Sequence, residues 1–96
     1  MYHVYLLKSK KKEIFYIGYT NNIEQRLKQH NSGQSEYTKK YMPWDVIYYE
    51  SFVSLEDAKV REKSLKFFGR TYNHLKLRIK NSLDKVKDLN RREGAG

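Results

Sequence analysis

The sequence YIGYTNNIEQRLKQHN, from Tyr16 to Asn31, joins a β-branched and aromatic run to an amphipathic helix through a polar turn. An asparagine of the NN pair is placed to cap the helix, and the NSG that begins at Asn31 ends it. Arg26 and His30 lie one turn apart on this helix and therefore share a face. The stretch predicts that a Tyr, an Arg and a His are directed at one neighbourhood.

Outward from this stretch, the pattern predicts an α+β fold with a small three-stranded antiparallel or mixed sheet flanked by helices. Residues 2–8 and 14–19 alternate and are rich in aromatic and β-branched side chains, which is typical of a hairpin. Residues 45–52 have a nearly continuous apolar centre and are expected to form the central strand. Helices are expected over residues 54–68 and 71–81, giving the order ββαβαα.

Length and composition indicate one small domain. The chain has 96 residues, of which 39% are apolar and 32% charged, so a single compact core is expected over residues 1–82. Residues 83–96 are expected to form a frayed helix or a basic, flexible tail. The absence of cysteine excludes a disulfide framework and a thiolate zinc site. With neither a leader-like segment nor an apolar membrane span, a soluble, cytoplasmic protein is expected.

A formal charge of +9 is large for a domain of this size and indicates a polyanionic partner. Nucleic acid is the first polyanion to consider, because closely spaced phosphates attract Lys and Arg and release counterions on binding. The alternative is a basic surface that only confers solubility. The candidate contacts to nucleic acid are Lys10, Lys11, Lys12, Lys39, Lys40, Lys66 and Arg70.

Glu62 lies in an apolar stripe of the helix predicted over residues 54–68. Leu55, Ala58 and Leu65 precede or follow it at helical spacing on one face. An ionised carboxylate there needs a cation or several hydrogen bonds to offset its desolvation. Glu62 is therefore either part of a functional site or one half of a salt bridge with Arg61, Lys66 or Arg26.

The residues around the opening stretch also allow two interpretations each. Arg26 either grips a phosphate with its fork of donors or is an ordinary exposed helix residue. Tyr5 and Tyr16 lie on adjacent predicted strands, where a pair of rings either packs or takes part in proton transfer. A phenol has an ordinary pKa near 10, so proton transfer at neutral pH would need nearby cations. Gly18 is expected at the end of its strand, near the site, where the missing side chain allows a tight turn or the close approach of another backbone or a ligand.

In combination, the motifs resemble the GIY-YIG nuclease domain. The segments VYLL, FYIGYT, RLKQHN, YYESF and AKVREKSLK occur in the order found in small stand-alone proteins related to the N-terminal domain of an excinuclease. The resemblance covers about residues 2–80. The first named motif corresponds to His3, Val4 and Tyr5, so His and Val replace its Gly and Ile while the Tyr is retained. The second corresponds to residues 16–18.

The resemblance implies a set of catalytic roles. Tyr16 matches the proposed general base, with Tyr5 assisting, and Arg26 matches the residue that offsets transition-state charge. His30 matches a position close to the scissile phosphate. Glu62 matches a metal ligand for one Mg²⁺ or Mn²⁺ ion. The family also carries a late Asn, for which Asn73 and Asn81 are both candidates.

The expected function is a divalent-metal-dependent endonuclease that hydrolyses DNA phosphodiester bonds in DNA repair or recombination. The main alternative is a nucleic-acid-binding module with weak or no catalysis. A third interpretation is a structural domain in which Glu62 and Arg26 form a buried ion pair. Charge alone does not distinguish RNA from DNA as the ligand, and no recognition helix indicates a preferred DNA sequence.

Overall fold

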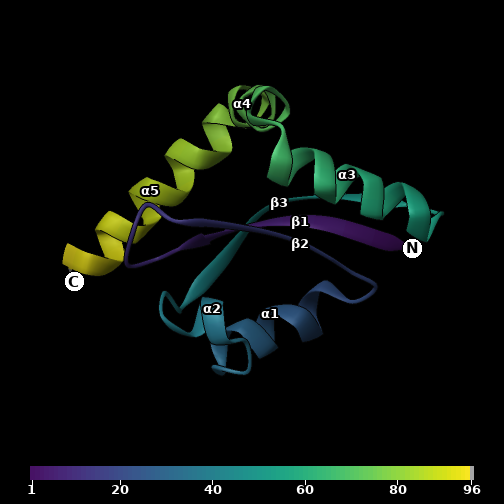
Figure 1. The fold of residues 1–96 in the computed structure, drawn as a ribbon. Coiled ribbons are helices and arrows are strands. Elements are labelled where there is room, and N and C mark those ends of the chain that lie inside the picture. The colour runs from purple at the N-terminus through teal and green to yellow at the C-terminus, as the bar shows by residue number, and fades with distance from the viewer. Residues whose placement is uncertain (96) are drawn as a thin grey trace.

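Three antiparallel strands form the centre of the molecule, and helices cover both faces of the sheet (Figure 1). The computed structural model describes residues 1–95, with side chains through residue 89. The strands are β1 (Tyr2–Ser9), β2 (Phe15–Thr20) and β3 (Trp44–Phe52), in the spatial order β2-β1-β3. This arrangement confirms the predicted α+β fold class.

Strand β1 lies at the centre of the sheet, so the expectation that residues 45–52 form the central strand is wrong. Every residue from Val4 to Ser9 is buried, whereas Trp44 is the only buried residue of β3. A central strand is covered on both faces and contributes side chains to two cores. The apolar run of β3 resembles such a strand in composition, but at the edge its side chains stay half-buried.

Five helices surround the sheet in the part of the chain that the structure describes. Helices α1 (Ile23–Asn31) and α2 (Glu36–Lys39) cover one face, while α3 (Leu55–Phe67) and α4 (Gly69–Arg78) cover the other, as Figure 1 shows. Helix α5 (Lys80–Ala95) continues from α4 along one end of the sheet. Helix α2 lies within residues 34–44, a polar segment for which the sequence predicts a loop. No described helix combines the length and the apolarity that crossing a bilayer requires.

Capping side chains begin helices α1 and α3 where the sequence indicates. The Asn22 side chain accepts a hydrogen bond from the backbone N–H of Gln25 at 3.1 Å, which begins α1. Ser54 accepts from the N–H of Asp57 at 3.4 Å and begins α3. These caps fix where α1 and α3 start and so set which side chains face the sheet.

The alternation of β1 divides the interior into two clusters, one on each face of the sheet. Val4 and Leu6 face α3 and α4, where they pack with buried residues of those helices. Tyr5 and Leu7 face the opposite side and pack with Trp44. An aromatic hydroxyl is thereby placed inside the second cluster, where polar groups require hydrogen-bond partners.

Helix α5 crosses the boundary that was expected near residue 82. Leu83 packs against the cluster that contains Val4, and Lys87 lies 3.8 Å from Glu13 of the hairpin turn. Residues 80–95 form a helix, whereas a frayed helix or a flexible tail was expected after residue 82. The division of the chain into a domain and a tail remains a prediction, and residue 96 lies outside the described residues.

Candidate active site

Four of the predicted catalytic residues meet in one cleft at the free edge of β2. The cleft has a volume of about 380 Å³ and is lined by Tyr5, Tyr16, Arg26 and Glu62 together with residues 18–20. These four side chains come from β1, β2, α1 and α3. Because β2 is an edge strand, α3 on one face and α1 on the other both approach the edge, which brings Glu62 and Arg26 together.

Gly18 lies within β2 and not at a turn, contrary to the expectation from sequence. It pairs directly with Tyr5 of β1, and the phenol ring of Tyr5 crosses over it. A Cβ atom at this position would lie 2.6 Å from Tyr5 Cζ and 3.1 Å from a ring carbon of Tyr16. The missing side chain therefore makes room for the two tyrosines.

We expect Gly18→Ala to destabilise the protein by about 1–3 kcal/mol, because the added methyl group overpacks a buried site. Urea denaturation measures this change. Gly69→Ala is the matched control, since Gly69 begins α4 and has no atom within 4 Å of its added Cβ. That variant should be neutral or slightly more stable. Equal stability of the two variants would contradict the packing role of Gly18.

Tyr5 belongs to a buried chain of hydrogen bonds that runs away from the cleft. Its hydroxyl lies 3.0 Å from His30 Nε2, and His30 Nδ1 lies 2.8 Å from Thr38 Oγ1. The Thr38 hydroxyl can itself donate to the Ser35 carbonyl at 3.5 Å, which leaves its oxygen free to accept from Nδ1–H. His30 Nε2 then accepts from the Tyr5 hydroxyl, which fixes the orientation of that phenol.

Burial keeps both partners of this chain neutral. It raises the pKa of Tyr5 to about 12, although a hydrogen bond from Arg26 opposes the shift. Burial also lowers the pKa of His30 to about 4, and the charge of Arg26 adds to that effect. His30 is 0% exposed and does not line the cleft. His30 was expected beside the scissile phosphate, but it lies behind Tyr5. In this position it orients the Tyr5 hydroxyl.

His30 predicts a pH dependence of folding. The unfolded chain protonates this imidazole near pH 6.5, whereas the folded protein resists protonation until about pH 4. The free energy of unfolding should therefore be highest above pH 6.5, and it should decline by about 3 kcal/mol as the pH falls to 4. Urea denaturation across this range should show a flatter profile for His30→Gln. Parallel profiles for the variant and the native protein would refute the assignment.

Tyr16 is the more accessible of the two tyrosines. Its ring centroid lies 6.3 Å from that of Tyr5 and 4.9 Å from that of His30, and its ring is half-buried. The Lys66 ammonium lies 5.6 Å from the centroid of the Tyr16 ring. Together with Arg26 in the same cleft, it places positive charge on both sides of the approach to Tyr16.

The two charged residues of the cleft have different partners. Arg26 Nη1 donates to Gln29 Oε1 at 2.7 Å, which holds the guanidinium along α1. Glu62 has a side chain only 13% exposed and pairs with Lys66 one turn later, with Nζ 3.6 Å from Oε1. Of the alternatives left open by the sequence, Lys66 is the partner, while Arg61 pairs with Glu50 of β3.

The donor set of the cleft fits a hard divalent cation bound mostly by water and substrate. Glu62 is its single carboxylate, and the described part of the chain holds no cluster of three His, Cys, Asp or Glu side chains. Mg²⁺ is commonly bound in this way, through one or two carboxylates with waters and phosphate oxygens completing an octahedron. A caged zinc or calcium site does not fit these residues.

Comparison with known proteins identifies the family of this chain. The family model of the GIY-YIG catalytic domain matches residues 1–74. The chain belongs to the GIY-YIG family. GIY-YIG domains are nuclease domains and use divalent metal ions.

Relatives of this GIY-YIG domain include two UPF0213 proteins. One from Staphylococcus haemolyticus is 40% identical over 70 residues, which cover 72% of this chain and 84% of that protein. One from Clostridium perfringens is 41% identical over 71 residues, covering 73% and 75%. The solution NMR structure of a UPF0213 protein from Bacillus halodurans is 30% identical, with a TM-score of 0.50 over 83% of this chain and 86% of that one.

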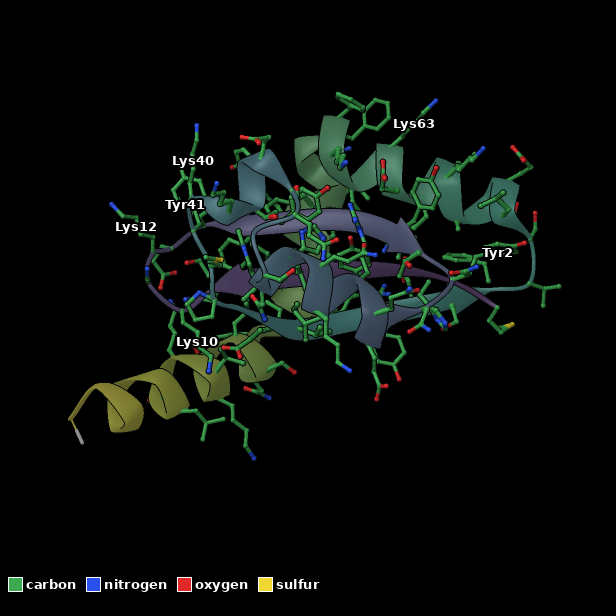
Figure 2. All side chains as sticks on the ribbon, turned by 90° about the horizontal axis from the view of Figure 1, so that it is seen from below. Tyr2, Lys10, Lys12, Lys40, Tyr41 and Lys63 are labelled. Atoms are coloured by element: carbon green, nitrogen blue, oxygen red, sulfur yellow. The ribbon has the colours of Figure 1, made fainter. Side chains whose placement is uncertain are left out.

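The predicted nucleic-acid contacts of this GIY-YIG domain fall into separate groups. Lys66 stands beside Glu62 and Tyr16 at the cleft. Lys10, Lys12 and Lys40 extend from the end of the molecule that carries the hairpin turn, as Figure 2 shows. Lys11 follows in the same turn, Lys39 ends α2, and Arg70 lies in the first turn of α4. The candidates Asn73 and Asn81 are exposed on α4 and α5, and neither lines the cleft.

Several supports of the site carry no signal in the sequence. Thr38 is 0% exposed and contacts His30, yet it lies in a segment that was expected to be a loop. Its carbonyl also accepts from the indole of Trp44 at 2.9 Å. Asn31 holds the end of α1 to β3 through two hydrogen bonds with the backbone of Trp44, at 2.6 and 3.2 Å. Only the position of Asn31 at a helix end gave a hint of such a role.

Proposed function

We propose that this protein is a divalent-metal-dependent endonuclease that hydrolyses DNA phosphodiester bonds, in DNA repair or recombination. The observation that carries the proposal is the meeting of Tyr5, Tyr16, Arg26 and Glu62 in one cleft of a chain with a net charge of +9. A base, a cationic fork and a carboxylate ligand are the groups that phosphodiester hydrolysis requires.

Each residue has a distinct part in the proposed reaction. Glu62 holds Mg²⁺ or Mn²⁺, which supplies Lewis acidity at the phosphate when bound. Tyr16, as a phenolate, takes the proton of the attacking water, while the bond from phosphorus to the leaving oxygen breaks and that oxygen takes a proton from solvent. Tyr5 lines the same cleft and is held by His30, so it orients the water. Arg26 donates hydrogen bonds to the phosphate oxygens as charge accumulates on them.

Binding of the ion requires a rearrangement of one side chain. Lys66 lies 3.6 Å from the Glu62 carboxylate, so its ammonium neutralises the ligand before the metal arrives. The lysine is partly exposed, and its flexible stem can move away from Glu62 at little cost. In the displaced position it remains near Tyr16, where it can contact a DNA phosphate.

A second candidate function is a nucleic-acid-binding module with weak or no catalysis. The ion pair between Glu62 and Lys66 favours it, because a carboxylate that keeps this partner would not bind a metal. The high positive charge would then serve binding alone, with affinity that falls steeply as salt rises. DNA and RNA would both be ligands of such a module.

Incubation of the protein with branched, nicked and linear DNA at low salt tests the proposal. With Mg²⁺ or Mn²⁺ we expect discrete cleavage products, and with EDTA none. Salt-dependent binding without cleavage, across both metals and all substrates, would favour the binding module instead. If the protein showed no binding and no cleavage with any of these substrates, both functions would be excluded.

A further inference from the structure

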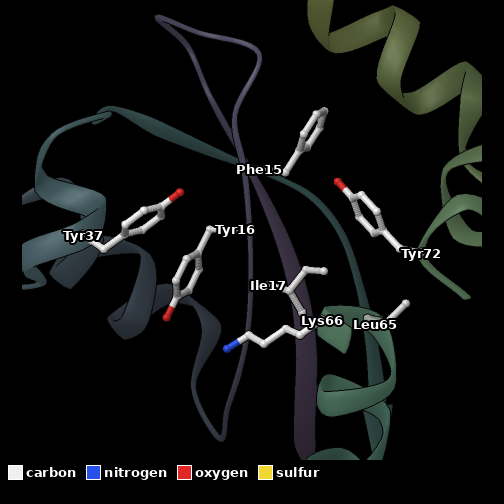
Figure 3. A pocket seen from close by; sticks show the side chains of 7 residues that line it. All are labelled: Phe15, Tyr16, Ile17, Tyr37, Leu65, Lys66 and Tyr72. Carbon is white, nitrogen blue, oxygen red and sulfur yellow. The ribbon is translucent and has the colours of Figure 1, made fainter. Parts of the chain in front are cut away.

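A second cleft lies beside the candidate active site and has aromatic walls. Its volume is about 370 Å³, and Tyr16 lines both clefts. Figure 3 shows Tyr37 and Tyr16 on one side of it and Phe15 and Tyr72 on the other. The first cleft holds the charged groups, so this neighbouring space is where the part of a substrate next to the reacting phosphate would lie.

The walls of the second cleft offer flat apolar surfaces. The rings of Tyr16 and Tyr37 lie 6.2 Å apart with a tilt of 33°, while Ile17 and Leu65 supply buried aliphatic contacts. Tyr37 is 51% exposed, although it is a large aromatic residue. About half of this residue stays open to solvent, so part of its ring is available to a planar ligand.

A cation lies where the two clefts meet. The Lys66 ammonium stands 5.6 Å from the Tyr16 centroid and 3.6 Å from Glu62, and its side chain also lines the aromatic cleft (Figure 3). A ligand that suits both features has a planar apolar group directly attached to an anion. A nucleotide has this chemistry, since its base stacks on aromatic rings and its phosphate attracts the lysine.

A base within a duplex does not fit such a cleft. Its two faces are stacked on neighbouring bases, and leaving the stack costs a few kcal/mol unless the base is already unpaired. Aromatic side chains that accept bases are accordingly a feature of proteins that bind single strands or extruded bases. The walls formed by Tyr37 and Tyr72 thus select for a base that is free of its partner.

We propose that the aromatic cleft binds an unpaired nucleobase of the nucleotide next to the phosphate that Arg26 contacts in the candidate active site. This inference rests on the proposed nuclease function and defines its substrate as DNA with at least one unpaired base at the site of cleavage. Tyr37 provides the accessible stacking surface, and Lys66 holds the connecting phosphate.

Fluorescence anisotropy in EDTA tests the cleft without relying on catalysis. The probes are oligothymidylate and an abasic oligomer of the same length and charge. We expect the native protein to bind oligothymidylate about 10-fold more tightly, in keeping with the stacking of one base. Tyr37→Leu should remove this preference, while Tyr37→Phe should retain it. Tyr49→Leu is the matched control, because Tyr49 is 56% exposed on β3 and lines neither of the two clefts.

Two results would overturn the inference. One is equal affinity of the native protein for the two oligomers, and the other is an undiminished preference in Tyr37→Leu. A fully paired duplex and a duplex with one mismatched base extend the test. Tighter binding of the mismatched duplex supports an extruded base, whereas Tyr37-dependent binding of the paired duplex with equal affinity contradicts the proposal.

The same measurements separate this inference from the proposed function. A base preference that depends on Tyr37, in a protein that cleaves no DNA with any metal, would support the cleft and reject the nuclease. Cleavage that depends on Mg²⁺ without any base preference would support the nuclease and reject the cleft.

Discussion

Glu62→Gln is expected to reduce metal-dependent cleavage by about 1,000-fold or more, because loss of the ligand removes several kcal/mol of charge stabilisation. Glutamine keeps the shape of the side chain but carries no charge, so packing in the stripe of α3 is preserved. Single-turnover cleavage of the best substrate of the panel measures the effect. Isothermal titration with Mn²⁺ should show the loss of metal binding directly.

Glu56→Gln is the matched control for this change. Glu56 lies in the first turn of the same helix and is exposed, so its neutralisation alters the net charge equally without touching the cleft. The control should cleave at the native rate. If Glu62→Gln cleaved DNA at the native rate, any required metal would be held by other residues. The assignment of Glu62 as the metal ligand would then be wrong.

Arg26→Ala is expected to lower the cleavage rate by about 100- to 1,000-fold, the usual cost of removing a donor that stabilises developing charge. The half-buried guanidinium lines the cleft and is held in place by Gln29. Its loss therefore removes N–H donors of fixed orientation. Single-turnover rates under saturating protein separate this loss from weaker DNA binding.

Two further variants define what Arg26 contributes. Arg26→Lys keeps the positive charge but not the planar fork, so we expect it to recover only a small part of the rate. Lys28→Ala removes the same charge from an exposed position on α1 and should leave the rate nearly unchanged at low salt. Equal cleavage rates for Arg26→Ala and Lys28→Ala would show that Arg26 contributes only its positive charge and no specific contact to the phosphate.

Local features of the chain were sufficient to predict much of the secondary structure. The caps at Asn22 and Ser54 begin α1 and α3 because their side chains bond backbone groups only three residues away. Strand β1 was predicted, but its central position was not. An apolar run reports that a segment is buried and says nothing of which neighbours bury it.

The candidate site was predictable where a charged side chain occurred among apolar residues of a predicted helix. Glu62 stood out as a carboxylate in an apolar stripe, and the structure places it in the cleft with Lys66 as its partner. Arg26 was unremarkable alone and gained significance from its place in the family motif. Gly18 was noticed as a position that allows a turn or a close approach, but the sequence did not show that a ring from another strand approaches it.

The sequence alone determined the three strands, helices α1, α3 and α4 and the net charge, since these depend on local spacing and composition, and its motifs resembled those of the GIY-YIG family. Only the tertiary structure decided that His30 lies behind Tyr5, that Thr38 supports it and that Tyr37 lines an aromatic cleft beside Tyr16. These contacts join residues of different elements, whose relative placement follows from packing around β1. Hydrogen bonds and ring contacts of this kind depend on distances of a few ångströms, and such distances exist only after the sheet and helices have packed.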